Sequence, residues 1–255
     1  GGFGGDVAFR SAQDPRLTAE IDTTNRRSAT GEVLVEALRL GAMPVQISQI
    51  QLGPWTSPDE KGFGLGPLFA DYIAFIHGIL VHPETGKRFV DERSDRKTLS
   101  DALLAVGKPS VCISDHAAVE RSGWNLSTAL KKEIVRTFPS LEALADAYGI
   151  SAKGLDTTVS NLQTEVDRPD PPTLDTPPYY AMKVWPKVHY TMGGVRIDQS
   201  ARVIGLDHQP IPGLYAAGEI AGGGHGACRL GSCAITDCLV FGRIAGREAG
   251  DRKGR

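Results

Sequence analysis

The sequence predicts an α/β fold into which a mostly helical middle segment is inserted. Patterns typical of short helices and strands alternate at both ends of the chain, whereas the patterns between them are largely helical. The composition also shifts near residue 48 and again near residue 190. With 255 residues, the chain is long enough for one large domain or two smaller ones, each with a buried core.

The first part of the chain predicts a helix followed by a strand. Apolar side chains are spaced as on one helical face within residues 31–41, and Gly41 is expected to end that helix in a left-handed conformation. Apolar residues then nearly alternate over residues 44–52, which is typical of a strand with one slip in its alternation.

The middle of the chain begins with a loop, because residues 53–67 are rich in glycine and proline. A β-hairpin is expected next, in which the apolar run 71–81 and residues 87–90 are joined by a turn at 82–86. Helices are then predicted for residues 98–106, 126–138, 140–149 and 155–167, with Ser140 as N-cap and Gly149 as C-cap of the third.

A proline-rich connector separates the middle from the end. Residues 168–178 hold five of the 16 prolines, which is typical of a rigid, extended segment. Beyond it, short strands are expected within 195–204 and 213–218, with a turn at 206–209, and a final helix at 234–249.

Composition and charge exclude several classes of protein. The net charge of −2 gives no cationic excess for nucleic acid or an anionic membrane surface, so we expect no nucleic-acid partner. No apolar run reaches the roughly 18 residues needed to span a bilayer. The opening at Gly1 resembles neither a signal peptide nor a natural start, which suggests a fragment or a processed chain. The compartment is undetermined, with the cytoplasm favoured.

The sequence predicts no metal site. His77 and His82 lack metal-ligand spacing with a third group. The four cysteines fit neither a disulfide scaffold nor a paired zinc motif: Cys112, Cys228, Cys233 and Cys238.

Glycine is the unusual component, with 30 residues that cluster in the first five positions and in 213–231. Part of the second cluster formally matches a dinucleotide-binding fingerprint, but the loop continues through Ser232 before any helix begins, so we reject that interpretation. A glycine-rich loop before a helix still lets backbone N–H groups approach a planar or anionic ligand, here at Ala234 and Ile235. An ordinary connection between a strand and a helix is the alternative.

Several motifs, taken in order, carry a resemblance to one family. They are GGFG at 1–4, GKRFVDE at 86–92 with Arg96 four residues on, VHYTMGGV at 188–195, IPGLYAAGE at 211–219, HGACRLG at 225–231 and FGRIAG at 241–246. Together they resemble the FAD-dependent fumarate reductase and flavocytochrome c flavoprotein family. This family is similar to the flavoproteins of succinate dehydrogenase and fumarate reductase. The resemblance covers essentially the whole chain.

The resemblance implies an α+β capping domain inserted in part of a Rossmann-like FAD-binding domain. Residues 1–48 would be the middle piece of the FAD-binding domain, 49–189 the capping domain that binds substrate, and 190–255 the C-terminal piece. In this family, the segment that binds the adenine end of FAD precedes GGFG, and the sequence does not contain it. That segment is therefore an expected partner of the chain.

The resemblance also implies a reaction, in which a hydride passes between flavin N5 and an unsaturated carboxylate while a side chain delivers a proton. Arg96 would be the proton donor, and because a guanidinium is a weak acid this role needs close contact and a relay that reprotonates it. Arg229 would clamp the substrate carboxylate, and His189 would bind or polarise the same end. Without the resemblance, Arg96 and Arg229 would be solvated cations and His189 a structural histidine.

The resemblance further assigns contacts with FAD. Glu219 matches the ligand to the flavin ribityl chain, and Tyr190 lies where some members have a second histidine near the flavin pyrimidine edge. The other expected contacts are Gly2, Gly194, Gly218, Arg229, Gly231, Ser232, Ala234 and Ile235. The electron donor that reduces the flavin is not identifiable.

Two departures from the family pattern bear on the substrate. Members specific for fumarate have a His-Pro pair where this sequence has Gly53 and Pro54. The Thr-Glu pair that helps to hold the second carboxylate falls on Ala70 and Asp71, and the relay arginine falls on Ala74. Asp71 is therefore included among the candidate catalytic residues. We expect a monocarboxylate enoate, including one with a bulky or aromatic β-substituent, rather than fumarate.

Two other functions remain open. A relative of the ketosteroid dehydrogenases would oxidise a ring C–C bond and would not need Arg96, His189 and Arg229 together. Alternatively, the chain is a non-catalytic fragment or subunit that binds FAD only with a partner chain.

Overall fold

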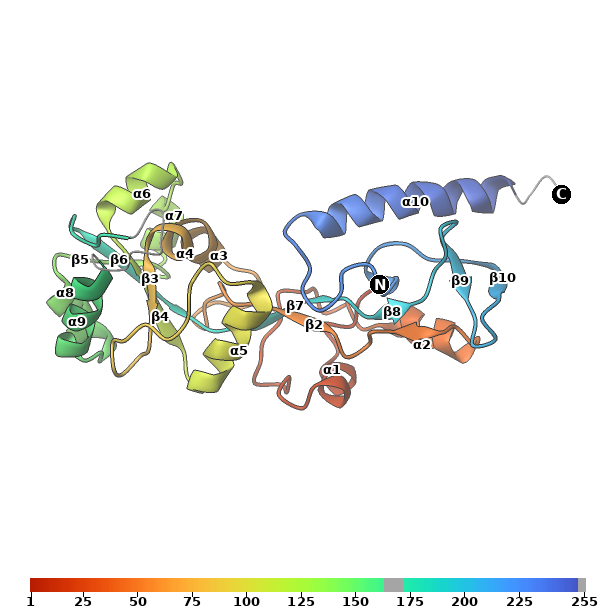
Figure 1. Cartoon of the computed structure of the whole chain (residues 1–255), viewed down its shortest axis with the longest axis horizontal. Helices are drawn as coiled ribbons and strands as arrows, with labels where there is room; N and C mark the ends of the chain where they lie inside the picture. Colours follow the sequence, from red (N-terminus) through yellow and green to blue (C-terminus); the bar gives the residue numbers. More distant parts are fainter. Residues whose placement is uncertain (163–171, 252–255) are drawn as a thin grey trace. The chain divides into compact units, whose positions relative to one another are not determined.

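The computed structural model describes residues 1–162 and 172–251 (Figure 1). The chain forms two compact units. Unit 1 comprises Gly1–Leu52 and Val188–Arg255, and unit 2 comprises Gly53–Lys187. Unit 2 is therefore inserted between two sequence segments of unit 1. The assignment of these regions to pieces of an FAD-binding domain and a capping domain stays a prediction.

Unit 1 begins with two short helices, α1 (Val7–Gln13) and α2 (Glu32–Arg39). Asp6 caps α1 by accepting a hydrogen bond from the Phe9 amide. On α1, the Arg10 side chain is only 2% exposed. Its guanidinium donates to the carbonyl groups of Gly4 (3.0 Å), Leu17 (3.1 Å), Thr18 (2.8 Å) and Ile21, so one side chain fixes the path of the first 21 residues.

The strands of unit 1 form three separate pairs. β1 (Pro44–Val45) pairs antiparallel with β8 (Gly194–Val195), and β9 (Arg202–Ile204) pairs antiparallel with β10 (Pro210–Tyr215). The third pair joins β2 (Ile50–Gly53) and β7 (Lys187–Thr191). Phe3, Leu34, Val195 and Val203 lie in one buried cluster, so residues from both ends of the chain share this core.

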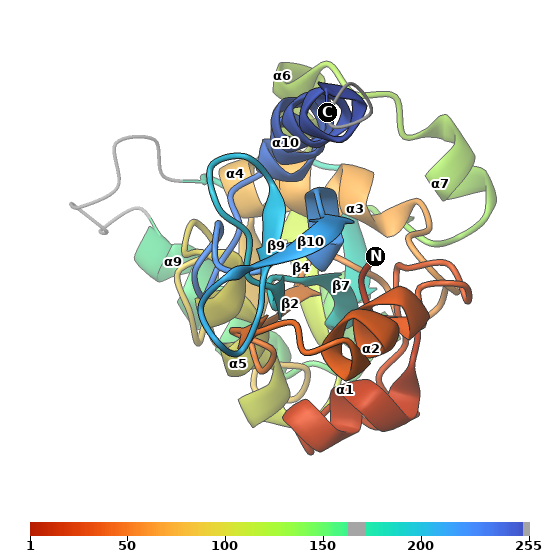
Figure 2. The same ribbon diagram turned by 90° about the vertical axis from the view of Figure 1, so that its right-hand side faces the viewer.

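The last segment of unit 1 is a short 3₁₀ helix, η2 (Gly218–Ile220), followed by the glycine-rich loop and the long helix α10 (Cys233–Asp251). Helix α10 contacts η2 and β10. Figure 2 views α10 nearly along its axis. None of its residues is fully buried.

Unit 2 is built on a four-stranded antiparallel sheet in the order β3-β4-β6-β5. The strands are β3 (Ile79–Val81), β4 (Ser110–Ser114), β6 (Tyr179–Val184) and β5 (Arg136–Phe138). Cys112 of β4 pairs with Met182 of β6, and both lie in one core cluster, whereas their neighbours Ile113 and Ala181 lie in the other. This alternation places a hydrophobic layer on each face of the sheet.

Different helices supply the two layers. The first contains residues of α3 (Gly66–Phe69), the π-helical segment η1 (Ala70–Ala74), α4 (Phe75–His77), α5 (Arg96–Val106), α6 (His116–Ser122) and α7 (Ser127–Lys131). The second contains residues of α8 (Leu141–Tyr148) and α9 (Ala152–Leu162). Helices on both faces explain why β3 and β4 are buried at every position.

Several sequence-based predictions are confirmed. Ser140 caps α8 through a hydrogen bond from the Ala143 amide, and Gly149 follows in a left-handed conformation. Gly41 is left-handed after α2, with a φ of 87°. The helices predicted at 98–106 and 234–249 lie within α5 and α10.

Others are wrong. The predicted hairpin at 71–90 does not form, because its first half is helical and β3 pairs with β4, while Val81 meets Arg88 only in an isolated bridge. The fully buried residues Phe69, Ala70, Ile73 and Ala74 have helical spacing, which an apolar run does not distinguish from a strand.

Two further elements differ from the prediction. Residues 126–138 contain the short helix α7 and the strand β5 rather than one helix, and residues 44–52 contain β1 and β2 rather than one strand, because Gln46 has a φ of 51°. The predicted end of the helix 155–167 and the start of the connector 168–178 lie outside the described residues.

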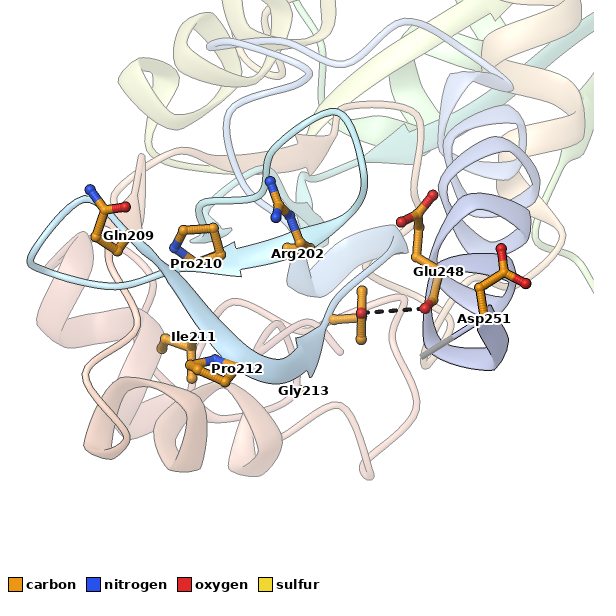
Figure 3. A pocket seen from close by; sticks show the side chains of 9 residues that line it. Arg202, Gln209, Pro210, Ile211, Pro212, Gly213, Glu248 and Asp251 are labelled. Carbon is orange, nitrogen blue, oxygen red and sulfur yellow. Dashed lines mark hydrogen bonds between the residues drawn. The ribbon is translucent and has the colours of Figure 1, made fainter. Parts of the chain in front are cut away.

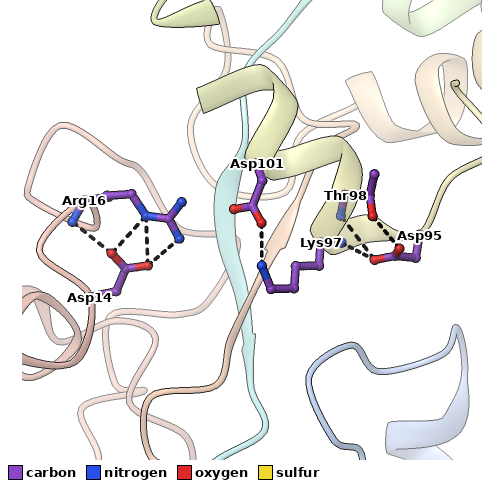
Figure 4. A network of polar contacts seen from close by, with 6 residues as sticks. All are labelled: Asp14, Arg16, Asp95, Lys97, Thr98 and Asp101. Atoms are coloured by element: carbon purple, nitrogen blue, oxygen red, sulfur yellow. Dashed lines mark hydrogen bonds and ion pairs between the residues drawn. The ribbon is translucent and has the colours of Figure 1, made fainter. Parts of the chain in front are cut away.

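We predict that Arg10→Met lowers the free energy of unfolding by about 3 to 5 kcal/mol, because it removes the guanidinium hydrogen bonds to four carbonyl groups, of which those of Leu17 and Thr18 keep a second donor. The control is Arg16→Met, whose guanidinium forms an ion pair with Asp14 at 2.8 Å (Figure 4). Because that pair is largely exposed, we expect its loss to cost less than about 1 kcal/mol. Urea unfolding of both variants measures the difference, and equal losses would contradict the role of Arg10.

Candidate active site

Two backbone segments of unit 1 touch without intervening side chains. A Cβ on Gly194 would lie 2.0 Å from the carbonyl oxygen of Ile220, and one on Gly222 would lie 2.5 Å from the amide nitrogen of Gly194. The Gly222 amide donates to the Val195 carbonyl at 2.9 Å. Glycine is therefore required at both positions, and β8 is joined directly to the start of the glycine-rich loop.

Glu219 is held at this junction. Its Oε1 accepts hydrogen bonds from the Thr191 amide (2.8 Å) and the Thr191 hydroxyl (3.1 Å). A Cβ on Gly2 would lie 2.3 Å from the same oxygen, so the first glycine cluster leaves room for this carboxylate. Within the described residues, Glu219 Oε2 accepts no hydrogen bond, which leaves an oriented acceptor for a ligand hydroxyl.

Arg229 is a second buried cation of unit 1, beside Arg10, with 6% of its surface exposed. Its amide donates to Gln51 Oε1 at 2.6 Å, its Nη1 donates to the Leu230 carbonyl at 2.8 Å, and its guanidinium lies 4.5 Å from the ring centre of Tyr190. Gln51 is 3% exposed, and its Nε2 has no partner among the described residues. A buried donor of this kind indicates a ligand that the amide would satisfy.

Tyr190 lies between Arg229 and His225. The rings of Tyr190 and His225 meet edge to face with centroids 5.7 Å apart, and His225 Nε2 is buried without a partner in the described part of the chain. Burial raises the pKa of Tyr190, the negative charges of Glu219 and Asp237 raise it further, and Arg229 lowers it. The phenol therefore stays protonated and is available as a hydrogen-bond donor.

His189 precedes Tyr190 on β7. Its Nδ1 lies 2.8 Å from the hydroxyl of Thr24, which fixes the orientation of the ring. The Thr24 hydroxyl also lies 3.4 Å from the Val188 carbonyl. His189 is half-buried, so a ligand can reach it.

The remaining predicted contacts lie along the glycine-rich loop and the start of α10. Gly218 is left-handed and packs against Cys238 Sγ, and Ser232 is also left-handed, with a φ of 64°. Gly231 accepts a hydrogen bond from the Cys233 amide at 2.9 Å. Ala234 and Ile235 lie in the first turn of α10, where the Ile235 amide donates to the Ser232 carbonyl at 3.1 Å.

Arg96 is the first residue of α5 in unit 2. Asp95 caps this helix by accepting from the amides of Lys97 and Thr98, as Figure 4 shows. The Arg96 guanidinium lies over the indole of Trp55, 5.5 Å from its centre. Asp71, on η1, interacts electrostatically with Arg96. Burial raises the pKa of Asp71, and the positive charge of Arg96 acts in the opposite direction.

The motif that precedes Arg96 has a structural role. Glu92 is 2% exposed, and it accepts from the Leu80 amide (2.7 Å) and from Arg88 Nε (2.9 Å). These contacts tie the segment before α5 to strand β3.

The predicted residues thus fall into two sets. Unit 1 contains His189, Tyr190, Glu219 and Arg229, together with the predicted glycines and Ser232, Ala234 and Ile235. Unit 2 contains Arg96 and Asp71. Sequence reasoning missed four polar or aromatic residues that touch them: Gln51, Trp55, Thr191 and His225. For Gln51, a signal was present in the sequence, because a glutamine within a predicted apolar strand is unusual.

The described residues of unit 1 line at least two cavities. One, of about 540 Å³, is lined by residues of the glycine-rich loop, including Gly222 and His225, and by Phe241 of α10. The other, of about 790 Å³, lies between the β9–β10 hairpin and the end of α10, where the Tyr215 hydroxyl donates to the Glu248 carbonyl at 3.4 Å (Figure 3). No predicted site residue lines the second cavity.

The described part of the chain contains neither a metal-binding cluster nor a helix that could cross a membrane. Within residues 1–162 and 172–251, no three His, Cys, Asp or Glu side chains are grouped so that they could hold a metal ion. In the same residues, no helix combines the length and apolar character needed to cross a membrane.

The family described as FAD binding domain matches residues 1–235. The chain is 40% identical over 265 residues to the acrylate reductase flavoprotein subunit of Shewanella woodyi, covering 97% of this chain and 52% of that protein. It is 39% identical over 259 residues to the fumarate reductase (cytochrome) of Shewanella frigidimarina, covering 98% of this chain and 44% of the relative. The chain spans about half the length of the curated relatives it matches.

Two solved structures share the fold. The open conformation of a flavocytochrome c3 fumarate reductase superposes with a TM-score of 0.74 at 31% identity, over 98% of this chain and 45% of that one. The 3-ketosteroid Δ1-dehydrogenase of Sterolibacterium denitrificans superposes with a TM-score of 0.73 at 23% identity, over 99% of this chain and 52% of that one. The second likeness concerns the fold alone.

We predict that the Asp71 carboxyl titrates above its ordinary value of 3.8 and that Arg96→Met raises this pKa further, because it removes a charge that favours the carboxylate. With its pKa raised in the folded state, Asp71 stabilises the fold most at low pH, and this contribution is lost as the pH rises through the folded-state pKa. A ¹³C NMR titration of the aspartate carboxyls measures the shift. Lys97→Met, which removes the partner of Asp101, should leave it unchanged. A lower pKa in Arg96→Met would contradict the assignment.

Proposed function

Because the chain belongs to the FAD binding domain family, we propose that it is part of a flavoenzyme that reduces the C=C bond of an α,β-unsaturated monocarboxylate. The overall change adds one hydride to the β-carbon and one proton to the α-carbon of the acid. The observation that carries this proposal is the buried Arg229, whose backbone is fixed by Gln51 and whose guanidinium lies over Tyr190.

The residues of unit 1 fit FAD. Glu219 offers an oriented oxygen to a ribityl hydroxyl, and the bare backbone at Gly194 and Gly222 allows a flat ring system to approach closely. The unpartnered amide of Gln51 and imidazole nitrogen of His225 are polar groups that a bound ligand would satisfy. When bound, FAD supplies the hydride.

Arg229 and His189 bind and polarise the substrate in this proposal. A planar guanidinium donates two parallel hydrogen bonds to a carboxylate, and its burial strengthens them. The half-buried ring of His189, oriented by Thr24, donates to the same carboxylate and draws electron density toward it. The β-carbon thereby becomes a better acceptor of a hydride.

Arg96 delivers the proton to the α-carbon in this proposal. Its guanidinium is held over Trp55 and interacts with Asp71. Because burial raises the pKa of Asp71, this carboxyl retains a proton more readily than an exposed aspartate, and we assign it to the relay that reprotonates Arg96.

The preference for one carboxylate rests on two positions of unit 2. Gly53 has no side chain, and Ala70 presents only a methyl group that is fully buried. Neither position offers a hydrogen-bond donor to a second carboxylate, whose transfer from water would then be unfavourable.

The test is reduction of acids by the flavoprotein isolated with its FAD, with dithionite-reduced methyl viologen as electron source. We expect kcat/KM for at least one of acrylate, cinnamate and urocanate to exceed that for fumarate by about tenfold or more. Faster reduction of fumarate than of every monocarboxylate would refute the preference for one carboxylate.

We predict that Arg229→Met lowers kcat/KM for the preferred acid by about 100-fold or more, because two charge-assisted hydrogen bonds are lost. The control is Arg27→Met, an exposed arginine of unit 1, which should retain the wild-type rate. Undiminished activity on acids in Arg229→Met, or dehydrogenation of a 3-ketosteroid that is independent of Arg229, would favour the steroid alternative. A purified chain without flavin absorbance and without activity would favour the non-catalytic one.

A further inference from the structure

The position of Gly53 is filled by another side chain of the same loop. A Cβ built on Gly53 would lie 2.9, 3.0 and 3.2 Å from three carbon atoms of the six-membered ring of Trp55. The indole therefore folds back over the glycine two residues before it. Any side chain at position 53 would have to displace this ring.

The indole has little freedom to move. Trp55 is 3% exposed, it belongs to the core cluster that includes Phe69, and its ring centroid lies 5.4 Å from that of Phe63. The guanidinium of Arg96 also lies over the ring, 5.5 Å from its centroid. A rigid ring in a packed core does not shift to admit an extra side chain without cost.

The backbone of the loop is also fixed. The Thr56 hydroxyl, which is fully buried, lies 3.0 Å from the Gly53 carbonyl and 2.7 Å from the Trp185 carbonyl. The Trp185 amide donates in turn to the Thr56 carbonyl at 2.9 Å. Position 53 therefore cannot move away from the indole to make room.

From these contacts we infer that Trp55 determines substrate specificity, by filling the space beside Arg96 that a carboxylate-binding side chain at position 53 would occupy. The inference rests on the proposed function, because it assigns a cause to the preference for monocarboxylates. The indole presents an apolar surface next to the Arg96 guanidinium. A second carboxylate in that space would lose its water and gain no donor.

The experiment compares Gly53→His, Trp55→Ala and the double variant Gly53→His/Trp55→Ala in the flavoprotein isolated with its FAD. Thermal unfolding and kcat/KM for acrylate and fumarate are measured for each. Trp124→Ala is the matched control, because this tryptophan of unit 2 is 46% exposed and its ring meets that of Tyr72 at an angle of 40° rather than lying under Arg96. It should change neither the unfolding temperature nor the ratio of fumarate to acrylate by much.

We expect Gly53→His alone to lower the unfolding temperature by about 5 °C through overpacking, without raising the ratio of fumarate to acrylate. In the double variant, the histidine occupies the space left by the indole. We expect it to be more stable than Trp55→Ala and to raise the ratio by about tenfold or more over both single variants.

Three results would overturn the inference. Gly53→His could be as stable as the wild type, Gly53→His alone could raise the ratio as much as the double variant, or the double variant could leave the ratio unchanged while the wild type reduces acrylate. A wild-type flavoprotein that reduced neither acid would instead refute the proposed function, and with it the substrate part of this inference. The comparison of unfolding temperatures would then still decide whether Trp55 excludes a side chain at position 53.

Discussion

The direct contact between two backbone segments in unit 1 is the constraint on which its site depends. Because Gly194 and Gly222 carry no side chains, strand β8 lies against the start of the glycine-rich loop, and the intervening Glu219 is brought to the Thr191 amide. The same arrangement explains the first glycine cluster, since Gly2 leaves room for the Glu219 carboxylate. Glycine enrichment here reflects close packing of backbone, in which a single added methyl group would separate residues far apart in sequence.

Unit 2 fixes Arg96, the proposed proton donor, by different means. Arg96 begins α5 and is placed by the Asp95 cap, by the buried contacts of Glu92 with β3, and by the face of the Trp55 indole. Hydrogen bonds set where the helix starts, and packing sets where the guanidinium points. An arginine held in this way loses less conformational freedom on binding than one in open solvent, which favours a defined geometry for proton delivery.

Local signals in the sequence predict local structure well. They fail where contacts with residues far away in the sequence determine the conformation. Ser140 and Gly149 define α8 because a cap requires only neighbouring atoms. The apolar run before Gly78 predicts one strand of a hairpin, but it is helical, and it is buried by strands that come later in the chain. Likewise, motifs predict Arg229 and Glu219 as site residues, but Gln51 is separated from Arg229 by 178 positions, and no local pattern links them.

Packing also accounts for specificity in the proposed site. Holding a dicarboxylate requires a second set of buried donors, and a buried donor is unfavourable whenever its ligand is absent. Filling the space beside Gly53 with the indole of Trp55 removes that requirement, because an apolar surface is satisfied by packing alone. Discrimination against a second carboxylate then needs no repulsive group, because removing that carboxylate from water is itself unfavourable. The aromatic ring that orients Arg96 is thus sufficient to account for the preference that we propose.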